Sequence, residues 1–232
     1  MAWDAQTVAG LWQLIDRRCS YDWQLKPAAK GRLHQIVPTF DTEIFNIPPE
    51  ELNIRLRMEL SPLLKAGDDR SLLLAKWIIK DWGGIKGGPD DAPGEWMETL
   101  GAFEDKTINN FIVKKSTKRI SSWSKLLAFA DSEKHAIYDA LTSVALNCAL
   151  RRLRDKRRFY MPDGRNNLIT EARLRLLRLD IEQNVATDSI GYIDYVELLA
   201  AFTKSGPAPS LLRAEMTVYA NANHIAHEFL TA

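Results

Sequence analysis

The stretch from Lys118 to Leu150, KRISSWSKLLAFADSEKHAIYDALTSVALNCAL, decides the interpretation of the fold. Its first part carries four apolar residues at helical spacing: Trp123, Leu126, Leu127 and Ala130. This spacing predicts a helix that buries those side chains, with Ser121 or Ser122 as its N-cap. The polar triplet at 131–133 then ends the helix.

A second helix is predicted to begin at Asp139. Apolar residues recur behind it every three or four positions: Leu141, Val144, Ala145 and Cys148. A carboxylate at such a position can accept hydrogen bonds from the first backbone N–H groups of the helix, and it lies in the positive field of the helix end. By itself, this pattern indicates a helix cap.

A basic hairpin, an apolar helix, a short connection and an Asp that opens the next helix follow one another in this stretch. That order resembles the second half of the helix-hairpin-helix DNA glycosylases, the superfamily that includes endonuclease III and 8-oxoguanine glycosylase. In style it is most similar to the small bacterial 8-oxoguanine-glycosylase-like group.

The resemblance implies that Asp139 is the catalytic aspartate and that residues 115–121 form the hairpin that holds DNA. The hairpin of this chain lacks the glycines of the family's usual leucine-proline-glycine-valine-glycine turn. The position at which bifunctional members carry a nucleophilic lysine falls near Ser121. The resemblance therefore implies a monofunctional enzyme, which releases the base by hydrolysis.

The composition is that of a globular protein long enough to bury a core. The chain has 232 residues, of which 46% are hydrophobic and 26% are charged. This length suits one globular domain or two small lobes. The formal net charge is only +1, so a role in binding nucleic acid has to rest on where the basic residues lie.

The two cysteines, Cys19 and Cys148, lie far apart and form no CxxC motif. This usage indicates neither a disulfide framework nor a zinc site, and it fits a reducing cytoplasm. The start of the chain lacks the basic residues and apolar core of a secretory signal, and no apolar run approaches the roughly 18 residues that span a bilayer. We therefore expect a soluble cytoplasmic protein, a monomer that does not associate with membranes.

The helical patterns along the whole chain predict an all-α fold, a compact multi-helix domain with a cleft between two helical lobes. We assign residues 1–48 and 139–232 to one lobe and residues 49–138, which carry the helix-hairpin-helix, to the other. Helix starts are predicted at Asp4, at the prolines before Glu50, and at Asp68. No strand-turn-strand series, internal repeat or low-complexity tract is present.

Two basic stretches are predicted to contact DNA. The candidate residues are Lys118, Arg119, Ser121, Ser122 and Lys125 in and after the hairpin, and Arg151 and Arg152 in the basic run 151–158. Backbone N–H groups at a helix N-terminus, hydroxyls and cationic side chains hold phosphates without reading sequence. The alternative for both stretches is a solvated charged surface.

Trp82 and Gly84 lie in the most glycine-rich part of the chain, and Tyr138 directly precedes Asp139. We predict these three residues for a base pocket, because an aromatic ring stacks on any base and glycine allows close approach of the backbone. The alternative for Trp82 is a tryptophan folded back onto the core from an ordinary surface loop.

No metal or cofactor is expected. The segment that begins at Asp188 looks like half of a calcium loop, but Ala186 and Ile190 stand where oxygen ligands belong. His224 and His227 are three residues apart and have no third ligand of matching geometry.

These features support three hypotheses. The first is a monofunctional DNA glycosylase that flips a damaged or modified base out of double-stranded DNA and hydrolyses its N-glycosidic bond with the carboxylate of Asp139, in repair or in defence against modified phage DNA. The second is a non-catalytic helical DNA-binding protein on the same scaffold. The third is a helical interaction protein whose basic face is incidental.

Overall fold

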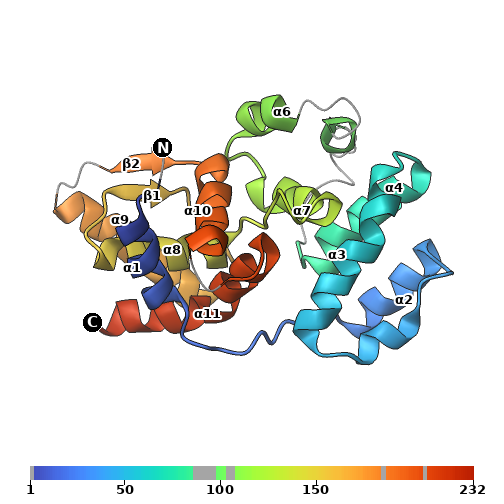
Figure 1. The fold of residues 1–232 in the computed structure, drawn as a ribbon, viewed down its shortest axis with the longest axis horizontal. Helices are drawn as coiled ribbons and strands as arrows, with labels where there is room; N and C mark the ends of the chain where they lie inside the picture. Colours follow the sequence, from blue (N-terminus) through green and yellow to red (C-terminus); the bar gives the residue numbers. More distant parts are fainter. Residues whose placement is uncertain (1–2, 86–97, 103–107, 184–186, 206–207) are drawn as a thin grey trace. The chain divides into compact units, whose positions relative to one another are not determined.

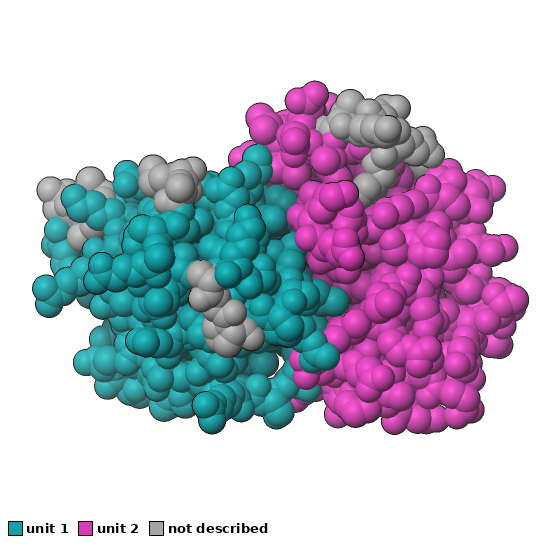
Figure 2. Space-filling view, in the orientation of Figure 1, with its two compact units in different colours: residues 1–21, 138–232 teal, residues 22–137 magenta. Residues whose placement is uncertain are grey.

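The computed structural model describes residues 3–85, 98–102, 108–183, 187–205 and 208–232. Within these residues the chain is mostly helical, which confirms the coarse prediction of a helical fold (Figure 1). None of the described helices is long and apolar enough to cross a membrane. The chain divides into two compact units, which Figure 2 colours separately: unit 1 comprises residues 1–21 and 138–232, and unit 2 comprises residues 22–137.

Unit 1 is built around one buried helix, α8 (Ala140–Arg152). Its other elements are, in chain order, α1 (Ala5–Ile15), β1 (Arg157–Phe159), α9 (Asn167–Glu182), β2 (Asp188–Ile190), α10 (Tyr192–Ser205) and α11 (Leu211–Thr231). In Figure 1, α8 lies among α1, α9 and α11, and it packs against all three and against β1. Every residue from Thr142 to Leu150 is buried. Small side chains such as Ala145 let the neighbouring helices approach closely.

Two very short strands are an exception to the helical fold. β1 and β2 pair in parallel, with Arg157 opposite Asp188 and Phe159 opposite Ile190. Asn147 fixes β1 to α8, because its side-chain amide donates to the backbone carbonyl of Phe159 at 2.8 Å and its oxygen accepts from the Phe159 N–H at 2.9 Å. Segments of this length are too short to show an alternating pattern, so the sequence does not predict them.

Unit 2 consists of α2 (Pro27–Ile36), the 3-10 helix η1 (Thr42–Asn46), α3 (Pro49–Lys65), α4 (Asp69–Trp77), the π-helix η2 (Ile78–Trp82), α6 (Ile108–Lys115) and α7 (Ile120–Ala130). α3 packs against α4 and α7, and α2 packs against α4. The indole N–H of Trp77, for example, donates to the backbone carbonyl of Ala29 at 2.8 Å. Residues 22–48, which the sequence analysis assigned to the other lobe, thus belong to unit 2.

The predicted helix starts at Asp4 and Asp68 are confirmed. Asp4 accepts a hydrogen bond from the Thr7 N–H at 2.8 Å and caps α1, and Asp68 does the same for α4 through the Ser71 N–H at 2.8 Å. α3 begins with Pro49 at its first turn, where a missing N–H costs nothing. These starts were predictable because each cap acts within three residues of its own position.

The hairpin between α6 and α7 has an unusual backbone. Two residues of the turn 116–119 have left-handed conformations, Ser116 with φ 46° and Arg119 with φ 53°. Arg119 is the N-cap of α7, and no side chain caps this helix. The prediction of Ser121 or Ser122 as N-cap is therefore wrong, because the left-handed residue at 119 starts the helix before either serine is reached. Positive φ values are usually adopted by glycine, but in this turn Ser116 and Arg119 adopt them.

We expect the substitution Ser116→Gly to stabilise the protein by up to about 1 kcal/mol, because glycine adopts a positive φ without the steric cost that a Cβ brings. Thr117→Gly, at the next position of the same turn, should destabilise it by roughly 0.5–1 kcal/mol through the added freedom of the unfolded chain. Urea titrations of the two variants give the free energies of unfolding. Equal destabilisation by both changes contradicts the strained turn.

Candidate functional site

Asp139 is the N-cap of α8 and forms a reciprocal capping box with Thr142. The Thr142 N–H donates to Oδ1 of Asp139 at 3.1 Å, and the Asp139 N–H donates to the Thr142 hydroxyl at 3.1 Å. Ser143 adds a hydrogen bond from its hydroxyl to the Asp139 carbonyl at 2.7 Å. The start of α8 therefore holds this carboxyl group in one position, in the positive field of the helix end.

The second carboxylate oxygen of Asp139, Oδ2, has no hydrogen-bond partner among the described residues. The side chain is half-buried, so this oxygen is neither sealed inside the core nor fully solvated. A carboxylate with one fixed and one open oxygen can stabilise a developing positive charge or accept a proton from water. This is the chemistry that the sequence analysis assigns to Asp139.

The segment 131–138 leads from α7 to Asp139 and carries a buried histidine. α7 ends where the Asp131 N–H donates to the carbonyl of Leu127 at 2.9 Å, and the His135 N–H then donates to the Asp131 carbonyl at 2.9 Å. Burial lowers the pKa of His135 to about 4, against the opposing effect of the Asp131 carboxylate. The imidazole is therefore neutral near neutral pH.

The predicted DNA-facing residues of the hairpin lie together at the start of α7 in unit 2. Lys118 and Arg119 are exposed, and Ser121 and Ser122 are half-buried. The indole N–H of Trp123 donates to the carbonyl of Lys118 at 3.0 Å and ties the turn to the helix. The backbone N–H of Ser121 has no partner within the described part of the chain. An uncapped helix start with exposed cations beside it suits a phosphate.

Lys125 takes a different position from these residues. Only 5% of its surface is exposed, and its Nζ donates to the carbonyl of Ser121 at 2.8 Å, one turn back along α7. Its stem lies against Gly83, where an added Cβ would stand 2.9 Å from both Cδ and Cε of the lysine. The glycine at position 83 thus makes room for the lysine, and Lys125 packs inside unit 2.

Trp82 is the last residue of the π-helix η2. π-helices are rare in proteins, and those that occur are often found at functional sites. Its ring is 7% exposed and packs against Trp23 and Phe129, each with its ring centre 4.9 Å away. Its indole N–H is buried without a hydrogen-bond partner in the described residues. Gly84 has φ 63° and open space around it. Residues 86–97, the rest of the glycine-rich stretch, lie outside the described residues.

Tyr138 lies in the core of unit 1. It has no exposed surface, its hydroxyl donates to the Tyr160 carbonyl at 2.6 Å, and its ring meets that of Tyr195 edge-on at 5.0 Å. Burial raises the pKa of the Tyr138 hydroxyl. A ring without exposed surface cannot stack on an extruded base in this conformation.

The arginines at the C-terminal end of α8 are held in ion pairs. Arg151 pairs with Asp180 of α9 at 2.8 Å and also bonds to Gln183, and Arg152 pairs with Glu228 of α11 at 2.6 Å. Both side chains thereby connect α8 to neighbouring helices of unit 1. Contact with DNA by either arginine stays a prediction.

Comparisons of the chain with protein-family models, with curated proteins and with solved structures found no match. The functional interpretation therefore rests on the residues and their geometry. The sequence analysis missed two residues that matter to it. Thr142 completes the capping box, and the Asp-x-x-Thr spacing signals it. Gly83 accommodates Lys125, and no sequence signal separates it from its glycine neighbours.

Replacing Asp139 tests its structural role apart from any chemistry. Asp139→Asn should change the free energy of unfolding by less than about 0.5 kcal/mol, because asparagine caps a helix as well as aspartate does. Asp139→Ala should cost about 1 kcal/mol through the lost cap. Thermal or urea unfolding measures both. An Asn variant as unstable as the Ala variant contradicts the geometry of this cap.

The low pKa of His135 predicts a dependence of stability on pH. The unfolded chain binds a proton at a pKa of about 6.5, whereas the folded protein binds it at about 4. Stability should therefore be complete above pH 6.5 and fall by about 2–3 kcal/mol as the pH approaches 4. The difference between the wild type and His135→Gln, from urea titrations across this range, isolates the effect. His34→Gln, at an exposed histidine, is the control and should leave the wild-type profile unchanged.

Proposed function

We propose that this protein is a monofunctional DNA glycosylase that acts on a damaged or modified base in double-stranded DNA. The observation that carries the proposal is the carboxylate of Asp139, fixed by its capping box at the start of α8 with Oδ2 open. In the chain it follows two helices joined by a short turn, α6 and α7, after the connecting segment 131–138. This is the order of elements that the resemblance to the glycosylase superfamily requires.

The hairpin supports the proposal through its backbone. The family's turn uses glycines, and this chain has none there, yet Ser116 and Arg119 adopt the left-handed conformations for which glycine is normally needed. At both positions the Cβ atom makes a positive φ sterically unfavourable. The result is an uncapped start of α7 with Lys118 and Arg119 exposed beside it, which fits contacts to a DNA backbone.

The proposed chemistry needs one carboxylate and no metal. As the bond between base and sugar breaks, positive charge builds on the sugar, in a transition state like the oxocarbenium ion of glycoside hydrolysis. The open oxygen of Asp139 stabilises that charge and orients or deprotonates the attacking water. The target nucleotide leaves the stack before this step, at a cost that contacts to the DNA offset.

The position of Lys125 supports hydrolysis by water over attack by an amine. A lysine that forms a Schiff base has to present its Nζ to the sugar. In this structure the Nζ of Lys125 donates to the carbonyl of Ser121 and the side chain is buried against Gly83. The proposal is therefore a glycosylase without a lyase step.

The decisive experiment compares Asp139→Asn with the wild type on duplexes that each carry one oxidised, alkylated, deaminated or hypermodified base. Abasic sites are scored as strand breaks after alkali. On whichever duplex the wild type cleaves, the variant should be slower by roughly 10²–10⁴-fold, because the amide carries no charge and accepts no proton. The affinity of the variant for the same duplex should stay within about threefold of the wild-type value. A large loss of rate with unchanged binding indicates that the carboxylate stabilises the transition state.

Asp68→Asn is the matched control, because Asp68 caps α4 with the same reciprocal box and is not one of the residues assigned to the proposed site. It should retain full activity. Base release that persists in Asp139→Asn shows the mechanism to be wrong. If the wild-type protein binds duplex DNA with a steep salt dependence but releases no base, the result supports a non-catalytic DNA-binding protein. If it does not bind DNA in this way, the result supports a helical interaction protein.

A further inference from the structure

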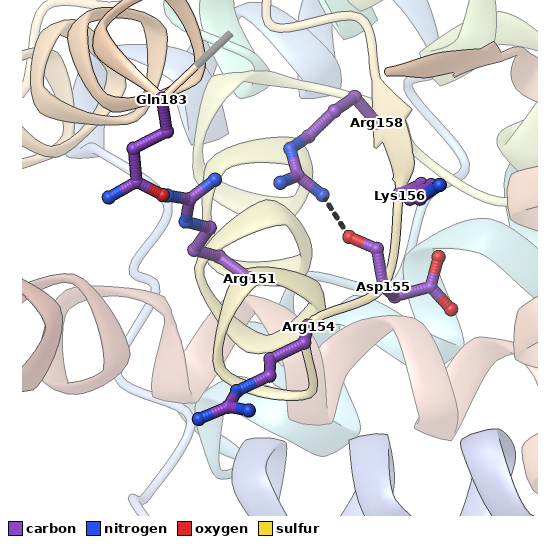
Figure 3. Close-up of a pocket in the computed structure, with 6 residues that line it drawn as sticks. All are labelled: Arg151, Arg154, Asp155, Lys156, Arg158 and Gln183. Atoms are coloured by element: carbon purple, nitrogen blue, oxygen red, sulfur yellow. Dashed lines mark hydrogen bonds between the residues drawn. The ribbon is translucent and has the colours of Figure 1, made fainter. Parts of the chain in front are cut away.

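A pocket of ≈ 390 Å³ opens in unit 1 at the C-terminal end of α8 (Figure 3). Its lining residues are Arg151, Arg154, Asp155, Lys156, Arg158 and Gln183. They come from the last turns of α8, the segment that leads into β1, β1 itself and the residue after α9. Four of the six are cationic.

Two of the cations are held in place by a single carboxylate. Asp180 accepts from Arg151 at 2.8 Å through one oxygen and from Nε of Arg158 at 3.1 Å through the other. Arg158 also donates to the backbone carbonyls of Asp155 and Arg157, at 2.7 and 2.8 Å. Figure 3 shows the guanidinium of Arg151 turned toward Gln183 and that of Arg158 toward Asp155. The wall of the pocket is therefore preorganised.

The lining contains one carboxylate, that of Asp155, and it does not neutralise the cations of the lining. Both oxygens of Asp155 are taken by the guanidinium of Arg157, at distances from 2.5 to 3.2 Å. Arg157 is not a lining residue, and it neutralises the charge of the Asp155 carboxylate. Arg151 and Arg158 share Asp180, and Arg157 is opposed by Asp155 and also by Asp4 and Asp188, so two cations of the lining are left without a carboxylate partner among the described residues.

Those two cations are Arg154 and Lys156. Both are exposed, and the side chains of both lack a hydrogen-bond or ion-pair partner among the residues that the structure describes. In Figure 3 the guanidinium of Arg154 extends away from the other labelled side chains. Its backbone, with φ 59°, closes α8: the Asp155 N–H donates to the carbonyl of Leu150 at 3.0 Å. The carbonyls of Ala149, Leu150 and Arg151 thus accept backbone N–H groups, and the two cations are available to a ligand.

We propose that this pocket binds the phosphate groups of a small anionic ligand, of the class of pyrophosphate or a nucleoside di- or triphosphate. Guanidinium forks and an ammonium group together match the geometry of phosphate oxygens. The volume lies at the lower end of the range for small-molecule sites, which suits a phosphate chain.

The pocket lies at the other end of α8 from the proposed catalytic site, and the choice of a free phosphate over the DNA backbone rests on that proposed function. Asp139 precedes the first residue of α8 and the pocket lies at its last turn, so nearly the length of a 13-residue helix, about 20 Å, lies between them. In the proposed function the reacting nucleotide lies at the Asp139 end of α8, at the opposite end of the helix from the pocket. A free phosphate ligand is therefore the better occupant than the DNA backbone.

Inorganic pyrophosphate is the probe, titrated against the full chain by calorimetry at constant ionic strength. The double variant Arg154→Gln with Lys156→Gln should bind it at least about tenfold more weakly, because it loses both unpaired cations. Its melting temperature without ligand should match that of the wild type, since neither side chain has a partner to lose. Arg178→Gln with Lys204→Gln removes the same charge from exposed positions outside the pocket and should bind as the wild type does.

Three results would overturn the inference. The first is absence of pyrophosphate binding by the wild type, and the second is an equal loss in the two double variants, which marks a general charge effect. The third comes from a parallel titration with an undamaged duplex: a larger loss of DNA affinity in the pocket variant than in the control variant assigns the pocket to the DNA backbone. Equal DNA affinity of both variants, together with selective loss of pyrophosphate, confirms a site for a free phosphate ligand.

Discussion

The hydrogen bonds between Asp139 and Thr142 set where α8 begins, and unit 1 is arranged around α8. Because the helix is buried from Thr142 to Leu150, its first turn packs in the core, and the hydrogen bonds with Thr142 fix the carboxyl group that caps it. One oxygen serves the fold and the other stays open. A single residue thereby combines a structural duty with a position suited to chemistry at the positive end of a helix.

The hairpin of unit 2 adopts a backbone that its residues do not favour. Ser116 and Arg119 are held in left-handed conformations, and α7 starts without a side-chain cap. Each departure costs stability on the scale of about 1 kcal/mol. Local rules broken together in one short turn are typical of functional sites, where strain is kept because it positions a contact.

The ion-pair partners of the basic run 151–158 change how its charges are interpreted. Read as a string of charges, it predicts a surface for phosphates. In the fold, Arg151 and Arg158 share Asp180, Arg152 pairs with Glu228, and only Arg154 and Lys156 remain without partners among the described residues. The paired arginines connect helices and shape a pocket wall, whereas the unpaired cations provide its charge. The five arginines and one lysine of this run, in which Arg157 pairs with Asp155, thus take two distinct roles.

The sequence by itself determined what acts over three or four residues: the helical fold class, the caps at Asp4, Asp68 and Asp139, and the buried face of α7. It misplaced the start of α7, because spacing does not reveal a left-handed residue. Only the tertiary structure decided the burial of Lys125 and Tyr138, the membership of residues 22–48 in unit 2, and the partners of the arginines. Those outcomes depend on contacts between residues far apart in the chain, such as Arg152 with Glu228, and no local pattern encodes which distant side chain will arrive.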